Sequence, residues 1–168
     1  MTAHNKIKTA DDVEVNIYQS TINKCKVIKD VFQDCDFDEN DEALPLSGIT
    51  SEVFSWVQLY CDNHKNEDNP TEEFLKETKY DEIEGEDNEF ISCFEVHQLF
   101  DLIMAANYLD CPGLLNLSCK KVASMIKGKT PQEIRDTFGI EDDLTPEELE
   151  QIKNGNEWCN EQYYHNSY

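Results

Sequence analysis

The sequence predicts an α+β domain followed by an all-helical extension. Residues 13–17 alternate apolar and polar side chains, which indicates a half-buried strand. Later segments, such as 51–61 and 96–104, carry apolar residues at helical spacing. Beyond them, toward the C-terminus, the chain contains helix signals only. A length of 168 residues suits one domain with an appendage.

The N-terminal part carries the strand signals and one helix signal. After the strand predicted at 13–17, Ile28, Val31 and Phe32 recur at helical spacing. Residues 44–46 read Leu-Pro-Leu. Proline in so short an apolar stretch is typical of an edge strand or an extended connector, because proline cannot donate a hydrogen bond to a neighbouring strand.

A central helix and a long acidic loop are predicted next. Residues 51–61 carry an apolar stripe at i, i+3, i+4 and i+7, formed by Val53, Trp56, Val57 and Tyr60. Residues 62–89 are polar and heavily acidic, which favours a solvated loop. Within that loop, residues 71–80 could form a short helix.

Two further helices follow. Ser92 and Glu95 have the spacing of a capping box, so a helix is expected to start near Ser92. One apolar face of this helix is predicted to contain Val96, Leu99, Phe100, Ile103 and Met104. The helix should end before the segment Asp110-Cys111-Pro112-Gly113. The next helix carries Leu115, Cys119, Val122 and Ile126 and should stop at Gly128.

Two short helical units end the chain. Thr130 and Thr145 are each followed by a proline at the first helical position and by a glutamate three residues after the threonine. Each unit is too short to be a stable helix alone in water. The units nevertheless carry more apolar side chains than they can bury against each other, namely Ile134, Phe138, Ile140, Leu144, Leu149, Ile152 and Trp158. The surplus predicts a protein partner.

Charge and composition argue against several functions. The net charge of −22 repels phosphate backbones and anionic lipids, so neither nucleic-acid nor membrane binding is expected. No window is apolar enough for a transmembrane helix, and the first residues lack the apolar region of a secretory signal. Seven cysteines without a C-x-x-C pair are expected to be free thiols, mostly buried.

The residues that could bind ions or carry catalysis form incomplete motifs. Asp34, Asp36 and Asp38 resemble the start of a calcium-binding loop, but Glu39 and Pro45 replace its glycine and its bidentate glutamate. A solvated acidic loop at 34–42 is the preferred interpretation, with weak cation binding as the alternative.

Cys61 and His64 have a spacing that could bind a metal or form a thiol–imidazole pair. The other cysteines are scattered along the sequence, so a buried Cys61 and an exposed His64 are expected instead. The phosphate-loop, dinucleotide-binding and hydrolase motifs are absent from the sequence. We therefore expect no catalytic residues and no cofactor. An enzyme that uses Cys61 and His64 is a competing hypothesis.

Three motifs in order carry a family resemblance. They are L-I-M-A-A-N-Y-L-D at 102–110, K-G-K-T-P-Q-E-I-R at 127–135 and N-E-W-C at 156–159. With these motifs, the chain resembles the S-phase kinase-associated (Skp) adaptor family, the linker subunits of SCF (Skp–cullin–F-box) E3 ubiquitin ligases. The resemblance implies a BTB/POZ domain at 5–127, a small sheet flanked by helices. It also implies a helical F-box-binding extension at 128–162 and a tail at 163–168.

The resemblance further implies a non-catalytic adaptor that bridges the N-terminal region of a cullin to F-box proteins, so that their substrates are ubiquitinated and degraded by the proteasome. A RING subunit and a ubiquitin-conjugating enzyme would be indirect partners, in cytoplasm and nucleus. The expected F-box interface comprises Leu115, Val122, Ile126, Ile134, Phe138, Ile140, Leu149 and Trp158. Asn107 and Tyr108 match family positions at the cullin interface, and Pro146 matches a position hydroxylated in some members.

Two non-ligase functions compete with this interpretation. One is an acidic BTB-type scaffold that self-associates. The other is a paralogue that sequesters F-box proteins without binding a cullin. A homodimer in the absence of an F-box protein is also expected to be possible.

Overall fold

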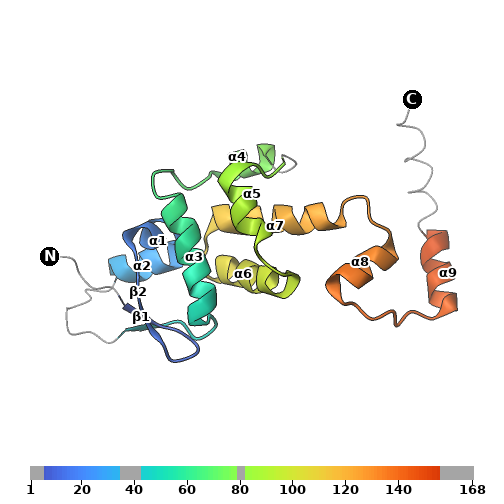
Figure 1. Cartoon of the computed structure of the whole chain (residues 1–168), viewed down its shortest axis with the longest axis horizontal. Coiled ribbons are helices and arrows are strands. Elements are labelled where there is room, and N and C mark those ends of the chain that lie inside the picture. Colours follow the sequence, from blue (N-terminus) through green and yellow to red (C-terminus); the bar gives the residue numbers. More distant parts are fainter. Residues whose placement is uncertain (1–5, 35–42, 79–81, 156–168) are drawn as a thin grey trace. The chain divides into compact units, whose positions relative to one another are not determined.

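The computed structural model describes residues 6–34, 43–78 and 82–155. The chain divides into two compact units, residues 1–127 and 128–168. The first unit contains the strands β1 (Lys6–Lys8), β2 (Glu14–Asn16) and β3 (Leu44–Pro45) and the helices α1 (Gln19–Lys24), α2 (Lys26–Asp34), α3 (Ser51–Asn63), α4 (Glu72–Glu77), α5 (Gly85–Ser92), α6 (Val96–Tyr108) and α7 (Pro112–Ile126) (Figure 1). The second unit contains α8 (Pro131–Phe138) and α9 (Pro146–Gly155).

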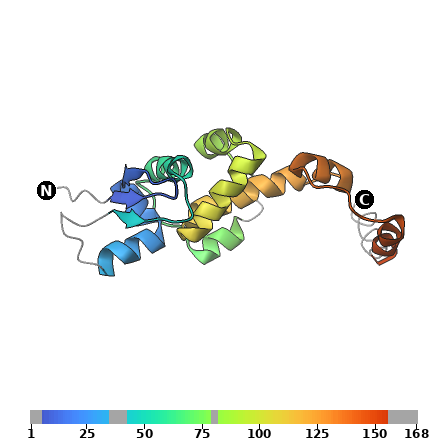
Figure 2. The same cartoon turned by 90° about the horizontal axis from the view of Figure 1, so that it is seen from below.

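The three short strands form one small sheet in the order β2-β1-β3. Strand β1 pairs antiparallel with β2, where Ile7 lies opposite Val15, and parallel with β3, where Ile7 lies opposite Leu44. Pro45 therefore lies on an edge strand, as its missing N–H predicts. Figure 2 shows the sheet beside α2 and α3 at one end of the unit.

Helix α3 is the central helix of the first unit and is held at its start by two side chains. The Thr50 hydroxyl oxygen accepts from the Val53 N–H at 3.4 Å, which caps the helix. The Asp11 carboxylate accepts from the Ser51 N–H at 2.9 Å and from the Ser51 hydroxyl at 2.6 Å. The hydrogen bond from the Ser51 hydroxyl is the main contribution that lowers the pKa of Asp11 to about 2. The β1–β2 connection is thereby tied to α3.

The segment predicted as a loop at 62–89 has more structure than expected. It contains α4, within the stretch that allowed a short helix, and the first residues of α5, which was not predicted. Ile91 of α5 is fully buried, so tertiary packing stabilises a helix whose sequence alone is too polar to predict it. The acidic segment 34–42 lies outside the described residues except for the backbone of Asp34, which ends α2.

The expected start of α6 near Ser92 is wrong. Ser92 is the last residue of α5, and α6 begins at Val96 with Glu95 as its N-cap. The Glu95 N–H donates to the Gln98 side-chain oxygen at 3.0 Å. The capping box is therefore formed by Glu95 and Gln98, three residues after the predicted pair of Ser92 and Glu95.

The buried face of α6 also differs from the predicted one. Leu99 is buried as expected, but the rest of the face consists of Leu102, Ala105 and Ala106. Phe100 and Met104 belong to the predicted apolar face, but their side chains are 42% and 67% exposed. Helix α6 packs against both α3 and α7, and the small alanines allow this close approach.

Helix α7 buries a stripe formed by Leu114, Leu117 and Ser118. The start of α7 lies close to α3: a Cβ atom added to Gly113 would lie only 2.6 Å from the Tyr60 hydroxyl. The described helices include none that is long and apolar enough to cross a membrane.

The second unit begins with the two capped helices that the sequence predicts. Thr130 caps α8 by accepting from the Glu133 N–H at 3.3 Å, and Glu133 accepts from the Thr130 N–H at 2.7 Å. Gly139 ends α8 in the left-handed conformation, with φ 64°. Thr145 and Glu148 repeat the reciprocal capping at α9. These local predictions are confirmed.

Candidate interaction surfaces and a thiol cluster

One set of partly exposed apolar residues runs along α7. Leu115 and Val122 are half-buried, and Ile126 is 40% exposed. These residues share a face with Cys119, and that face is distinct from the buried stripe at Leu114 and Leu117. The helix therefore has a second apolar face that the core of the first unit does not fully cover.

The second unit supplies further partly exposed apolar residues. Ile134, Phe138 and Leu149 are half-buried, and Ile140 is 55% exposed. None of the side chains described in this unit is fully buried. Trp158, the remaining expected F-box residue, lies outside the described residues.

Asn107 and Tyr108 both lie exposed at the C-terminal end of α6. Tyr108 is 49% exposed, so it is not the core residue that a tyrosine near a helix end would usually be. Met104 and Phe100 precede Tyr108 by one and two helical turns, and the three side chains form an exposed apolar strip. The sequence did not indicate that Phe100 and Met104 lie at the surface. The signal that could have indicated it is that this helix has apolar residues on more than one face, so that the core cannot cover all of them.

Pro146 is exposed at the first position of α9. Its neighbour Thr145 donates its hydroxyl to Glu148 at 2.9 Å and caps the helix. Capping therefore explains the Thr-Pro pair structurally, and the proline ring remains accessible to solvent.

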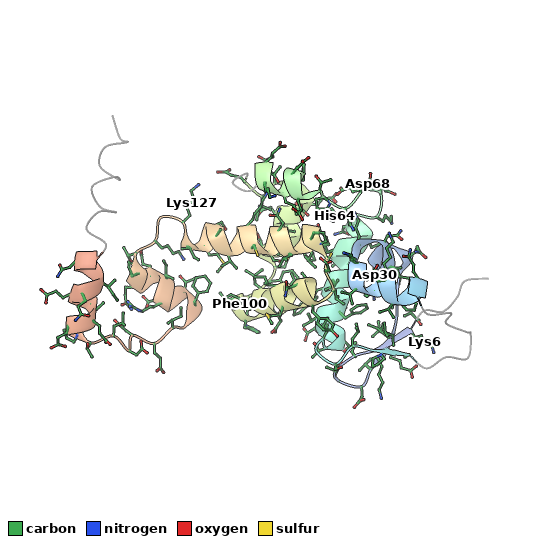
Figure 3. The ribbon with its side chains drawn as sticks, turned by 180° about the vertical axis from the view of Figure 1, so that it is seen from behind. Lys6, Asp30, His64, Asp68, Phe100 and Lys127 are labelled. Carbon is green, nitrogen blue, oxygen red and sulfur yellow. The ribbon has the colours of Figure 1, made fainter. Side chains whose placement is uncertain are left out.

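His64 is not the exposed residue that the sequence predicts. Its Nδ1 lies 3.0 Å from the Tyr60 carbonyl oxygen, and its Nε2 lies 3.1 Å from Asp87 Oδ1 in α5. The hydrogen bond to Asp87 is the main cause that raises the pKa of His64. His64 also stacks on the Tyr60 ring, with 4.2 Å between ring centroids. The imidazole is thus held by α3 and α5, next to the loop that carries Asp68 (Figure 3). Both of its nitrogens have partners other than Cys61, so the thiol–imidazole pair does not form.

Three cysteines that are scattered along the sequence meet in the interior of the first unit. The sulfur atoms of Cys25, Cys61 and Cys111 all lie within 4.8 Å of one another, and all three residues are buried. The other described cysteines, Cys93 and Cys119, are exposed, and none of these five thiols forms a disulfide with another described residue. Their separation along the sequence therefore gave no sign of this cluster.

The three thiols influence one another's protonation. Hydrogen bonds from Cys25 and Cys61 lower the pKa of Cys111, and the Leu114 N–H contributes in the same direction. The hydrogen bond with Cys111 is correspondingly the main cause that raises the pKa of Cys25. The protonation of each thiol therefore depends on the other two.

Cys111 borders a cavity of ≈ 610 Å³ that is confined to the first unit. Tyr60 and His64 line the cavity from α3, and the carboxylates of Glu67, Asp68 and Asp87 add negative charge to its wall. A cation would be attracted into this cavity.

The fold and the exposed apolar residues on α6, on α7 and in the second unit define a protein-interaction module of α+β type, and the comparisons with known proteins identify its family. Residues 5–66 match the tetramerisation domain of the Skp1 family, and residues 112–159 match the dimerisation domain of that family. The first of these is the family's BTB/POZ domain.

Curated relatives match nearly the whole chain. The chain is 37% identical over 160 residues to "E3 ubiquitin ligase complex SCF subunit sconC" of Talaromyces stipitatus, covering 95% of this chain and 98% of the relative. It is 40% identical over 155 residues to "SCF ubiquitin ligase complex protein SKP1a" of Dictyostelium discoideum, covering 92% and 94%. It is 39% identical over 159 residues to "Skp1-related protein" of Caenorhabditis elegans, covering 92% and 90%. This chain belongs to the Skp1 family.

Proposed function

We propose that this chain is an adaptor subunit of an SCF-type E3 ubiquitin ligase. The observation that carries this proposal is the match to relatives named as SCF subunits. The match covers nearly the full length of this chain and of each relative. The adaptor bridges a cullin scaffold to F-box proteins, so that the substrates held by those proteins are ubiquitinated and degraded. It acts without a catalytic centre of its own, through its binding surfaces.

The residues proposed to contact F-box proteins, together called the proposed F-box surface, lie on α7 and, separately, in the second unit. Leu115, Val122 and Ile126 on α7 have apolar area outside the core, and Ile134, Phe138, Ile140 and Leu149 have it in α8, α9 and the segment between them. Interfaces of this kind have an apolar centre and aromatic anchors. Trp158 belongs to the same proposed surface by its motif.

The proposed cullin surface lies at the C-terminal end of α6. Asn107 and Tyr108 match the family positions for this contact and are exposed. The neighbouring Met104, 67% exposed, extends the apolar strip that such a partner would cover. A RING subunit and a ubiquitin-conjugating enzyme then join through the cullin. We propose cytoplasm and nucleus as the compartments, because family members act in both.

Co-purification tests this function. The full chain is mixed with an F-box domain and a cullin N-terminal fragment and analysed on a sizing column with light scattering. A 1:1:1 complex is expected. A complex with the F-box domain alone would instead indicate an F-box-sequestering paralogue. A homodimer that the F-box domain fails to dissociate would indicate a self-associating scaffold, and either result would contradict the adaptor function.

A further inference from the structure

We propose that Cys25, Cys61 and Cys111 form a binding site for one thiophilic divalent cation, with Zn²⁺ as the cellular ion. The three residues come from separate elements: the joint between α1 and α2, the last turn of α3 and the N-cap of α7. An ion bound there would link these elements within the first unit. This site is independent of the proposed F-box and cullin surfaces.

The distances allow the site to form with small movements. Zinc–thiolate bonds are about 2.3 Å long, which places the sulfurs of a tetrahedral site about 3.8 Å apart. The three sulfurs already lie within 4.8 Å of one another. Each pair therefore has to approach by at most about 1 Å, which rotation about side-chain bonds can supply.

The surroundings position the ligands. The Cys25 N–H donates to the Thr21 carbonyl at 2.9 Å, and the Cys111 N–H donates to the Ala106 carbonyl at 2.9 Å. The joints that carry these two cysteines are also bonded to each other, because the Lys26 N–H donates to the Asp110 carbonyl at 3.1 Å. The backbone thus holds Cys25 and Cys111 together without the ion.

The local charge suits a divalent cation. Three thiolates and one Zn²⁺ leave a single negative charge, and a buried charge needs a partner. Lys24 is 6% exposed and lines the cavity together with Cys111. Its ammonium group donates to the Glu67 carbonyl at 2.7 Å and offsets that remaining charge. A site of this composition is close to neutral.

The cavity beside Cys111 provides a route for the ion and a place for a fourth ligand. Lys24, Tyr60 and Cys111 line it together with several carboxylates. Zinc sites with three protein ligands are completed by water. When the ion binds, the protons of the thiols pass to the solvent through this opening, so binding strengthens as pH rises.

The first test uses a variant that keeps only the three cluster cysteines. Cys35→Ser, Cys93→Ser, Cys119→Ser and Cys159→Ser are combined in the full chain, which is kept reduced with a phosphine. Co²⁺ is added as the spectroscopic probe, because thiolate ligands produce an intense sulfur-to-cobalt charge-transfer band. One Co²⁺ per chain with this band, displaced by Zn²⁺, is expected. Absence of the band in this variant overturns the proposal.

The second test removes the ligands one at a time. Cys25→Ala, Cys61→Ala and Cys111→Ala should each lower Zn²⁺ affinity at least about tenfold, since loss even of an outer-shell partner costs roughly 10–100-fold. Cys93→Ala and Cys119→Ala are the matched controls at exposed cysteines and should leave the affinity unchanged. Circular dichroism verifies that each variant is folded. Equal Zn²⁺ affinity in the cluster variants and in the controls would contradict the assignment.

Discussion

His64 and Asp87 form an ion pair that joins the end of α3 to α5. His64 Nε2 lies 3.1 Å from Asp87 Oδ1, while Nδ1 faces the Tyr60 carbonyl at 3.0 Å. Both ring nitrogens thus face acceptors, and only the protonated imidazolium can donate to both. The His64 side chain is 16% exposed, so solvent screens this pair less than it screens the surface ion pairs.

This pair should make stability depend on pH. The hydrogen bond to Asp87 raises the pKa of His64 in the folded state. Its stabilisation is therefore complete below the unfolded-state pKa of about 6.5 and is lost as pH rises through the raised pKa. His64→Gln should lower the free energy of unfolding most at acidic pH, and its difference from the wild type should shrink as pH rises. Urea unfolding at a series of pH values measures this difference.

His97→Gln is the control for this experiment, because His97 is an exposed histidine at the start of α6. The His97 variant should follow the pH profile of the wild type. A His64 effect that is constant with pH, or that grows toward alkaline pH, would contradict the ion-pair interpretation.

The two faces of α6 can be compared with one type of substitution. Leu102 is fully buried, so Leu102→Ala should lower the free energy of unfolding by about 2–5 kcal/mol. Met104 is 67% exposed, so Met104→Ala should change it by no more than about 0.5 kcal/mol. Denaturant unfolding of the full chain measures both. The reverse order would mean that α6 is rotated relative to the arrangement described here.

The capping box of α8 can be tested at Thr130. Thr130→Ala removes the acceptor of the Glu133 N–H and should lower helix stability by about 1 kcal/mol. Thr137→Ala makes the same chemical change inside α8, where alanine is the best helix former, and should not reduce helicity. Circular dichroism and amide exchange in α8 distinguish the two variants. Equal losses of helicity would show that the cap is not the stabilising contact.

The proposed F-box surface predicts an effect confined to one face of α7. Ile126→Glu places a charge on the partly exposed apolar face and should weaken F-box binding by at least about 2 kcal/mol, roughly thirtyfold. Ser124→Glu adds the same charge on a different side of the helix and should leave the affinity unchanged. Calorimetry with an F-box domain measures both affinities. Cullin binding should persist in both variants, and its loss in Ile126→Glu would indicate misfolding.

The proposed cullin surface predicts the complementary result. Tyr108→Ala should weaken binding of a cullin N-terminal fragment by at least about 2 kcal/mol, because exposed tyrosines at interface centres are frequent anchors. F-box binding and the free energy of unfolding should be unchanged within about 0.5 kcal/mol. Lys76→Ala, on α4, is the surface control. A Tyr108 variant with normal cullin affinity would remove this residue from the interface.

The sequence by itself determined the features that depend on neighbouring residues. Apolar periodicity along single segments predicts the α+β class and the helix over 51–61, and capping residues three positions apart predict the helix starts at Thr130 and Thr145. The structure confirms these predictions. The Skp1 family was recognisable from three contiguous motifs, and the full-length relatives confirm it. The assignment of residues to the two partner surfaces stays a prediction.

Only the tertiary structure decided which residues meet across the chain. Helix α6 has apolar side chains on two faces, and its contacts with α3 and α7 determine that Leu102 is buried and Met104 exposed. The ion pair of His64 and Asp87 joins residues 23 positions apart, and the thiol cluster joins Cys25 to Cys111. Such juxtapositions leave no periodic signal in the sequence, because long-range packing, and not local propensity, brings these side chains together.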